Sequence, residues 1–299
     1  DNDENGFVDD IHGWNFIRKN ADVRPVFQAA QSDDAWSHGT MVASLLGAKG
    51  DDGLGMAGVA WNVQIMPLVA LDAHGSGVTR NIVASIHYAV TMGAEIINLS
   101  LAGYDRDPVL EGVIQQAAEA GVLIVAAVGN DEARQGMNID QMPVYPACQD
   151  VDEDAVIGVG GTDRLDEHAP YTNYGRSCTD ISAPAFDLFV ARPSYAHDPY
   201  GSPGSVPLYR SGVLGTSLAA PLVSGAAALL KSVHPDWTAV RIRDRLYETV
   251  DTLSSSELVN GKGVGGYGRL NVGRALEPLP APVIPVSSCS MADANCPLL

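Results

Sequence analysis

The strongest constraint on this chain is the segment 215–230, GTSLAAPLVSGAAALL, in which a serine follows a glycine at the start of an apolar helical stretch. Glycine lets the backbone approach another molecule closely, and a helix start supplies unpaired N–H groups with a partial positive charge. The many small residues allow tight packing, so we expect a buried central helix. Ser217 is therefore a candidate nucleophile. The alternative is an ordinary Ala-rich core helix with a capping hydroxyl.

Two further segments supply a base and an amide. In SHGTMVASLLG, residues 37–47, His38 precedes an apolar helical stripe, and imidazole titrates near the working pH, as a general base must. In VLIVAAVGND, residues 122–131, Asn130 follows an apolar run typical of a strand buried on both faces of a parallel sheet. Taken alone, such a histidine is more often structural or solvated, and such an asparagine more often belongs to a turn at the end of a strand.

Apolar runs alternate with helical patterns through most of the chain. We expect strands at residues 63–71, 94–99 and 122–128, and helices at residues 79–92, 109–120 and 237–250. This alternation predicts a parallel sheet covered by helices on both faces. Functional residues of such sheets gather at the carboxyl ends of the strands, which is where Asn130 is expected.

Charge and hydropathy exclude some functions. The chain holds 36 Asp and Glu against 18 Lys and Arg, a formal net charge of −18. This balance argues against nucleic-acid binding and favours solubility in a salty or extracellular medium. No uninterrupted run of about 18 apolar residues is present, so we expect no membrane span. A hydrophobic share of 46% with 31 glycines fits one large α/β domain with many tight turns.

Taken together, the motifs around His38, Asn130 and Ser217 resemble those of the subtilisin-like serine proteases, the subtilases. The resemblance implies a three-layer α/β fold with a mostly parallel central sheet. It also implies a secreted, extracellular serine endopeptidase that works through an acyl-enzyme. Ser217 would attack the peptide carbonyl, His38 would be the general base, and Asn130 would donate to the oxyanion. We expect polypeptide substrates, a monomer and no organic cofactor.

The chain departs from the family pattern at two places. Met41 stands where the family usually has a second histidine, and we expect this change to affect packing or metal sensitivity more than the mechanism. The family's orienting aspartate, in a pattern like Val-x-Asp-Thr-Gly, has no match in residues 1–37. Such an aspartate holds the imidazole in the right tautomer and stabilises its cation. We therefore expect an N-terminally incomplete peptidase domain that is nearly inactive by itself, with Asp9 or Asp10 as the alternative orienting acid.

Two other classes of protein stay open. An impaired fragment or a pseudoprotease would act as a peptide-binding module, but such a protein is expected to have lost the base or the oxyanion donor. An α/β-hydrolase would show Gly-x-Ser-x-Gly with its histidine after the serine, whereas His38 comes first in this chain.

The resemblance also suggests substrate contacts in two segments, for which plain loops are the alternative. The first resembles a family segment that lines the pocket for the residue before the scissile bond, with alanine replacing one glycine: Ser100, Leu101, Ala102 and Gly103. The second resembles the edge strand that pairs with extended substrate backbone: Gly75, Ser76 and Gly77.

The opening segment is a candidate calcium site, because oxygen ligands stand at alternate positions before a glycine. The expected ligands are Asp1, Asp3, Asn5 and Asp9, with Asp10 as the alternative to Asp9. A complete EF-hand loop is not expected, since position 12 holds a histidine in place of the bidentate glutamate. The alternative is an acidic, disordered start.

The secreted character of the family and proximity in sequence point to two disulfides, Cys148 with Cys178 and Cys289 with Cys296, with free thiols as the alternative. A zinc site is not expected, because no Cys-x-x-Cys pair is present. Closely spaced prolines mark residues 277–299 as a linker or tail, so the peptidase domain is expected to cover residues 1–276.

Overall fold

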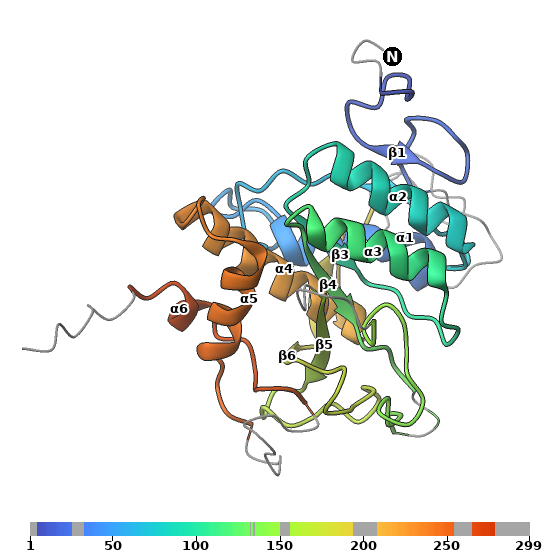
Figure 1. Ribbon diagram of the computed structural model, residues 1–299. Helices are drawn as coiled ribbons and strands as arrows, with labels where there is room; N and C mark the ends of the chain where they lie inside the picture. The colour runs from blue at the N-terminus through green and yellow to red at the C-terminus, as the bar shows by residue number, and fades with distance from the viewer. Residues whose placement is uncertain are drawn as a thin grey trace, which may run out of the picture.

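A parallel four-stranded sheet forms the centre of the protein in a computed structural model, which describes residues 5–25, 33–131, 133, 135–149, 156–193, 208–253 and 265–278. The strand order is β3-β4-β5-β6 (Figure 1). The strands are β3 (Ile96–Leu99), β4 (Leu123–Ala127), β5 (Val156–Thr162) and β6 (Ile181–Pro184). All three strand pairs are parallel. The predicted parallel α/β architecture is confirmed.

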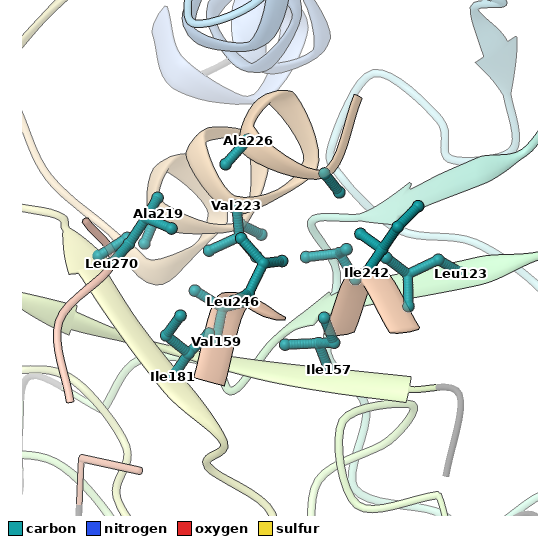
Figure 2. Packing of buried hydrophobic residues seen from close by; sticks show 14 of the residues in the cluster. Leu123, Ile157, Val159, Ile181, Ala219, Val223, Ala226, Ile242, Leu246 and Leu270 are labelled. Carbon is teal, nitrogen blue, oxygen red and sulfur yellow. The ribbon is translucent and has the colours of Figure 1, made fainter. Parts of the chain in front are cut away.

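Helices cover both faces of this sheet. On one face, α4 (Thr216–Val233) and α5 (Ala239–Glu248) pack against β4, β5 and β6 (Figure 2). On the other, α2 (Thr79–Thr91) and α3 (Pro108–Glu119) lie side by side over β3 and β4 (Figure 1). Alternate residues of β4 divide between the two cores, because side chains of a strand point to opposite faces. The protein is therefore a three-layer sandwich.

Shorter elements complete the described chain. They are β1 (Trp14–Asn15), α1 (Asp33–Gly47), β2 (Leu68–Val69), β7 (Leu188–Ala191), β8 (Tyr209–Val213) and α6 (Val272–Ala275). Strands β1 and β2 form a separate parallel pair, and β7 and β8 form an antiparallel pair. Helix α1 contacts both α4 and β7, so it joins the central helix to this antiparallel pair.

The predicted elements are confirmed in type, and most ends shift by one or two residues. The exception is the strand expected at residues 63–71, of which only Leu68–Val69 is strand. A ladder needs a neighbour, and β2 pairs with β1 alone. The apolar pattern therefore located β2 correctly but predicted too long a strand, because the second edge of β2 has no partner among the described residues.

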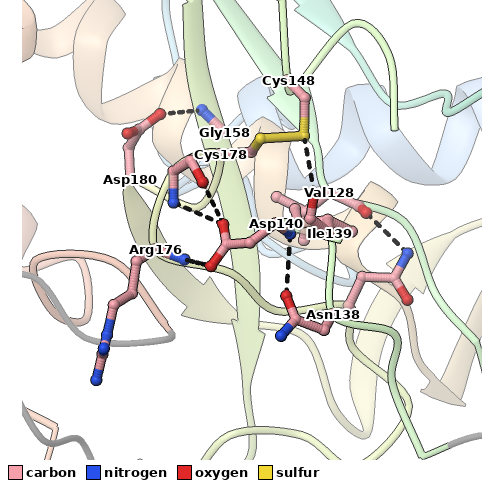
Figure 3. The surroundings of a disulfide bond; sticks show 11 residues. Val128, Asn138, Ile139, Asp140, Cys148, Gly158, Arg176, Cys178 and Asp180 are labelled. Atoms are coloured by element: carbon pink, nitrogen blue, oxygen red, sulfur yellow. Dashed lines mark hydrogen bonds between the residues drawn. A yellow bond between two sulfur atoms is a disulfide. The ribbon is translucent and has the colours of Figure 1, made fainter. Parts of the chain in front are cut away.

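The predicted Cys148–Cys178 disulfide is present and joins positions 30 residues apart in the sequence (Figure 3). Beside it, the Asp140 carboxylate accepts hydrogen bonds from the backbone N–H groups of Arg176 and Ser177, each at 2.8 Å. The disulfide and this carboxylate thus hold the loop before β5 to the loop before β6. Cys289 and Cys296 lie outside the described residues, as does most of the expected tail.

Helix α4 has the length and the mean hydropathy, 1.3, of a helix that could cross a membrane. By length and composition alone, this helix therefore does not fit the expectation that the chain contains no possible membrane span. However, 61% of this helix is buried inside the protein, as befits the predicted central core helix.

The crossing of α1 and α4 is set by a glycine. A Cβ added at Gly225 would lie 2.7 Å from the Val59 Cβ and 3.1 Å from the Leu46 carbonyl oxygen, which belongs to α1. No real side-chain carbon tolerates the shorter distance, so the two helices approach closely because residue 225 has no side chain. Since α1 carries His38 and α4 carries Ser217, this contact fixes the spacing of the two helices that bear the candidate site.

We predict that Gly225→Ala lowers the free energy of unfolding by about 1–3 kcal/mol, because the new methyl group forces α1 and α4 apart. Gly112→Ala in α3 is the matched control, since a Cβ there meets no atom within 4 Å. It should raise stability by about 0.5–1 kcal/mol through helix propensity. Urea unfolding of both variants measures the difference, and equal stability of Gly225→Ala and the wild type would contradict the close approach.

Candidate active site

The candidate site is organised around Gly215, immediately before α4. Its φ of 139° lies where residues with a side chain rarely go, and its N–H donates to the Ala185 carbonyl at 2.9 Å and to the Tyr171 hydroxyl at 3.2 Å. A Cβ at Gly215 would lie 3.3 Å from the Ser217 Oγ and 3.6 Å from the Asn130 Nδ2. The Ser217 hydroxyl and the Asn130 side-chain amide therefore both point to the space beside Gly215, which has no side chain to fill it.

Asn130 is oriented by its own hydrogen bond. It follows β4 at the carboxyl end of the sheet, and its Oδ1 accepts from the Thr216 N–H at 2.9 Å. The amide oxygen is thus directed at the helix start and the Nδ2 toward Gly215. Within the described part of the chain, the Ser217 N–H makes no hydrogen bond. Two N–H donors at a helix N-terminus are thus available to an oxygen that carries negative charge.

A buried asparagine holds the loop that carries Asn130. Asn173 is 1% exposed, donates from Nδ2 to the Val128 carbonyl at 3.0 Å and accepts from the Met137 N–H at 3.0 Å. A Cβ at Gly129, whose φ is +83°, would lie 2.9 Å from that Nδ2. Glycine is therefore required before Asn130, both for its backbone angle and for the close approach of Asn173.

A chain of polar side chains reaches the nucleophile's backbone from β3. The Ser100 hydroxyl donates to the Ser217 carbonyl at 2.6 Å. Asn98 Nδ2 donates to the Ser100 Oγ at 2.9 Å, and the Ser224 hydroxyl donates to the Asn98 Oδ1 at 3.0 Å. These bonds tie the first turn of α4 to the end of β3, so the position of Ser217 depends on the sheet as well as on its own helix.

His38 lies on α1 and is half-buried. It lines a cavity of about 2840 Å³, the central cavity, together with residues of β2, β3, α2 and α4. Met41, one turn later, is 1% exposed and packs in a core cluster with Val190 and Leu218. The predicted packing role of Met41 is confirmed, and it helps to fix α1 against α4.

The predicted substrate segments also line the central cavity, but one differs in conformation. Ser100 and Leu101 directly follow β3, and Gly103 exchanges two backbone hydrogen bonds of 2.8 Å with Tyr145. Residues 75–77 form no strand: the Asp72 carboxylate accepts from the His74 and Ser76 N–H groups and closes a turn. The pairing of Gly75, Ser76 and Gly77 with substrate backbone therefore stays a prediction, because this segment has no strand partner among the described residues.

The expected calcium ligands are only partly described, because Asp1 and Asp3 lie outside the described residues. Asn5 Oδ1 accepts from the Phe7 N–H at 2.7 Å, while its Nδ2 donates to Asp10 at 2.9 Å. Asp9 is exposed. A hydrogen bond from the Tyr88 hydroxyl lowers the pKa of Asp10. No group of three candidate metal ligands occurs among the described residues.

Sequence reasoning missed the residues that support the site: Tyr171, Asn173, Asn98 and Ser224. Asn98 carried a usable signal, because it is a polar residue inside the apolar run of a buried strand. Tyr171 and Asn173 carried none, since the Tyr171 partner Gly215 lies 44 positions away and the Asn173 partner Val128 lies 45 positions away in the sequence.

Removing the Tyr171 hydroxyl tests the support of Gly215. We expect Tyr171→Phe to lower the free energy of unfolding by about 0.5–1.5 kcal/mol and to speed amide exchange at Gly215, because the hydroxyl bonds both Gly215 and the Ala185 carbonyl. Tyr174→Phe is the matched control, since the Tyr174 hydroxyl has no hydrogen bond within the described residues. Unchanged exchange at Gly215 in Tyr171→Phe would refute this role.

Comparison with known proteins shows which family this chain resembles. The subtilase family model matches residues 7–265. The chain is 36% identical over 284 residues to a cell wall-associated protease of Bacillus subtilis, a match that spans 88% of this chain and 28% of that protein. It is 32% identical over 232 residues to a subtilisin of Bacillus pumilus, with 77% and 76% covered.

A solved structure gives the same result for the fold. A protease from Pseudoalteromonas arctica superposes with a TM-score of 0.63 at 30% identity, over 80% of this chain and 69% of that one. The chain thus spans little more than a quarter of the cell wall-associated protease but most of the subtilisin and of the solved protease.

Proposed function

Because this chain belongs to the subtilase family, we propose that it carries the machinery of a secreted serine endopeptidase that cleaves polypeptides through an acyl-enzyme. The observation that supports this most is the convergence of the Ser217 Oγ and the Asn130 Nδ2 on Gly215. Both side chains stand at the carboxyl end of the sheet beside an unpaired helix-start amide. Asn130 is exposed and Ser217 only half-buried, so a substrate can reach them.

The proposed reaction assigns one role to each of Ser217, His38 and Asn130. The Ser217 Oγ attacks the carbonyl carbon of the scissile peptide bond, and His38 takes the hydroxyl proton. The negative charge that forms on the carbonyl oxygen is stabilised by the Ser217 N–H and the Asn130 Nδ2. His38 then gives its proton to the leaving amine as the C–N bond breaks, and water releases the acyl group by the same steps in reverse.

The orienting aspartate remains a prediction. Residues 1–37 contain no Val-x-Asp-Thr-Gly, and loss of this acid alone costs on the order of 10⁴-fold in turnover in a subtilisin. Hence residues 1–299 by themselves should hydrolyse peptides very slowly, and an impaired, peptide-binding fragment is the second candidate. The retained nucleophile, base and amide favour the protease.

The test combines labelling with turnover. A fluorophosphonate should label Ser217 in the 299-residue chain, located by mass spectrometry, and His38→Ala and Asn130→Ala should slow the labelling. We expect Asn130→Ala to lose on the order of 10²–10³-fold in acylation rate, the size measured for such a donor in a subtilisin. Asn62→Ala, at an exposed asparagine, is the matched control and should label at the wild-type rate.

The possible outcomes separate the two proposals. Labelling at another serine, or equal rates for Asn130→Ala and Asn62→Ala, would contradict the assigned site. Full, inhibitor-sensitive peptidase activity of residues 1–299 would leave the site intact and contradict the expected need for a further aspartate.

The setting of this activity is proposed from the relatives and from composition. One relative is described as a cell wall-associated protease, and a net charge of −18 favours an extracellular, soluble, monomeric enzyme. The described Cys148–Cys178 disulfide fits an oxidising compartment. We assign residues 1–276 to the peptidase domain and 277–299 to a linker.

We also propose a structural calcium ion at the N-terminal segment, supported by the oxygen donors at residues 1, 3, 5 and 9. Calcium titration by calorimetry should show binding to the wild-type chain and none to Asp1→Ala/Asp3→Ala. Asp51→Ala/Asp52→Ala removes the same charge elsewhere and should bind as the wild type does. Equal calcium binding by both double variants would contradict a site formed by Asp1 and Asp3.

A further inference from the structure

One loop, residues 168–174, holds the turn that carries Asn130, and we call it the support loop. The Asp131 N–H donates to the Tyr171 carbonyl of this loop at 2.8 Å. The Asn173 N–H donates to the carbonyl just before Asn130 at 3.0 Å. The support loop therefore bonds the chain on both sides of the proposed oxyanion donor.

The same loop reaches the start of α4. The Tyr171 hydroxyl accepts from the Gly215 N–H at 3.2 Å. Tyr171, Thr172 and Asn173 are all buried, so they cannot rearrange without moving their neighbours. A change in the packing of the support loop is therefore passed on to both Asn130 and Gly215.

His168 is the first residue of the support loop. It forms an isolated antiparallel bridge with Thr162, the last residue of β5. Its half-buried imidazole makes a hydrogen bond with the Asn173 backbone and lies edge-on to the Tyr174 ring, with 5.8 Å between the ring centroids. The imidazole thus joins the first residue of the support loop to its last two.

The second nitrogen of this imidazole is different. The His168 Nε2 is buried and has no hydrogen-bond partner among the described residues, so the bond to Asn173 belongs to Nδ1. In the neutral imidazole Nδ1 is then the donor, and Nε2 carries only a lone pair. Protonation would place a charged N–H at a buried position without an acceptor, which costs far more free energy than an unpaired lone pair.

In the described part of the chain, no charged side chain offsets this cost. Burial is the largest influence and lowers the pKa of His168, while the hydrogen bond with Asn173 raises it. Asp163 lies close by in the sequence, but its Oδ1 accepts from the N–H groups of Leu165 and Glu167. The Glu167 side chain is exposed to solvent.

The elements packed against the support loop also carry charged residues. They are Asp131 after β4 and Asp140 in the loop before β5. The Asp140 carboxylate accepts from the backbone N–H groups of Arg176 and Ser177, and neither aspartate contributes to the pKa of His168.

The direction of this pKa fixes the pH dependence. If the support loop opens and exposes His168 to water, the imidazole titrates near 6.5, whereas its pKa in the closed loop is lower. Above about pH 6.5 the imidazole is neutral in both states. As the pH falls from about 6.5 toward the lowered pKa, the open state binds the proton first, so the closed loop loses stability.

We propose that His168 is a positioning residue of the protease site. Its neutral imidazole closes the support loop on Asn130, and its protonation releases the loop together with the amide that stabilises the oxyanion. This inference rests on the proposed function, because it concerns the oxyanion donor of that reaction. It assigns the site a second histidine, which acts through the support loop and does not touch the substrate.

Hydrogen exchange of the 299-residue chain tests the release of the loop. The amides of Asp131 and Asn173 report the closed loop, and the amide of Val125 in β4 reports the fold as a whole. We expect the protection of Asp131 and Asn173, relative to Val125, to fall at least about fivefold from about pH 8 to about pH 5, because one unit of lowered pKa corresponds to a factor of about ten.

His168→Asn keeps a donor near the place of Nδ1 and cannot be protonated there. It should hold the protection of Asp131 and Asn173 within about twofold over the same pH range. His87→Gln, which removes an exposed imidazole on α2, is the matched control and should behave as the wild type does. Constant protection in the wild type, or an equal fall in His168→Asn, would overturn the proposal.

An NMR titration of the His168 imidazole in the wild type covers the case in which His168→Asn does not fold. The midpoint should lie below about 6.5 and coincide with the loss of protection at Asp131 and Asn173. A midpoint at or above that value, or one at a different pH from the loss of protection, would overturn the proposal.

Fluorophosphonate labelling of Ser217 connects the loop to the chemistry. The labelling rate of His168→Asn divided by that of the wild type should rise at least about threefold from about pH 8 to about pH 5, since His38 titrates in both chains. A constant ratio would overturn the positioning role. No labelling of Ser217 at either pH would contradict the proposed function itself, and the exchange data would then still show whether His168 closes the loop.

Discussion

The whole candidate site depends on the bare backbone at Gly215. Its N–H is held by the Ala185 carbonyl and the Tyr171 hydroxyl, and the next N–H, of Thr216, is held by Asn130. These bonds leave the N–H of Ser217 as the first free amide of α4 within the described residues. A side chain at position 215 would occupy the space between the Ser217 hydroxyl and the Asn130 amide. The functional geometry is thus a consequence of one missing Cβ and three backbone hydrogen bonds.

The supports of this point come from distant parts of the chain. Asn173 fixes the loop of Asn130, Ser100 fixes the Ser217 carbonyl, and Gly225 fixes the spacing of the helices that carry His38 and Ser217. Packing around them is dense, with the inner strands β4 and β5 almost wholly buried on both faces. A rigid scaffold of this kind holds an exposed asparagine and a half-buried serine in fixed positions without burying them.

Local patterns predicted much of this architecture. The alternation of apolar runs and helical stripes predicted the parallel sheet, and the glycine and serine at residues 215–217 predicted the helix start. The pattern could not show that β2 lacks a neighbour, since a strand's apolar sequence is the same whether or not its partner is present. Nor could it show that Asp72 closes a turn at residues 75–77, or that Tyr171 reaches Gly215. These features depend on side-chain bonds and on contacts across the fold, which have no local sequence signal.

A structure of the 299-residue chain with a peptidyl phosphonate on Ser217 tests the account most directly. The account predicts a phosphonyl oxygen about 2.7–3.1 Å from both the Ser217 N–H nitrogen and the Asn130 Nδ2, with the His38 imidazole beside the Ser217 Oγ. A phosphonyl oxygen that faces solvent, with the Asn130 amide turned away from it, would contradict the account.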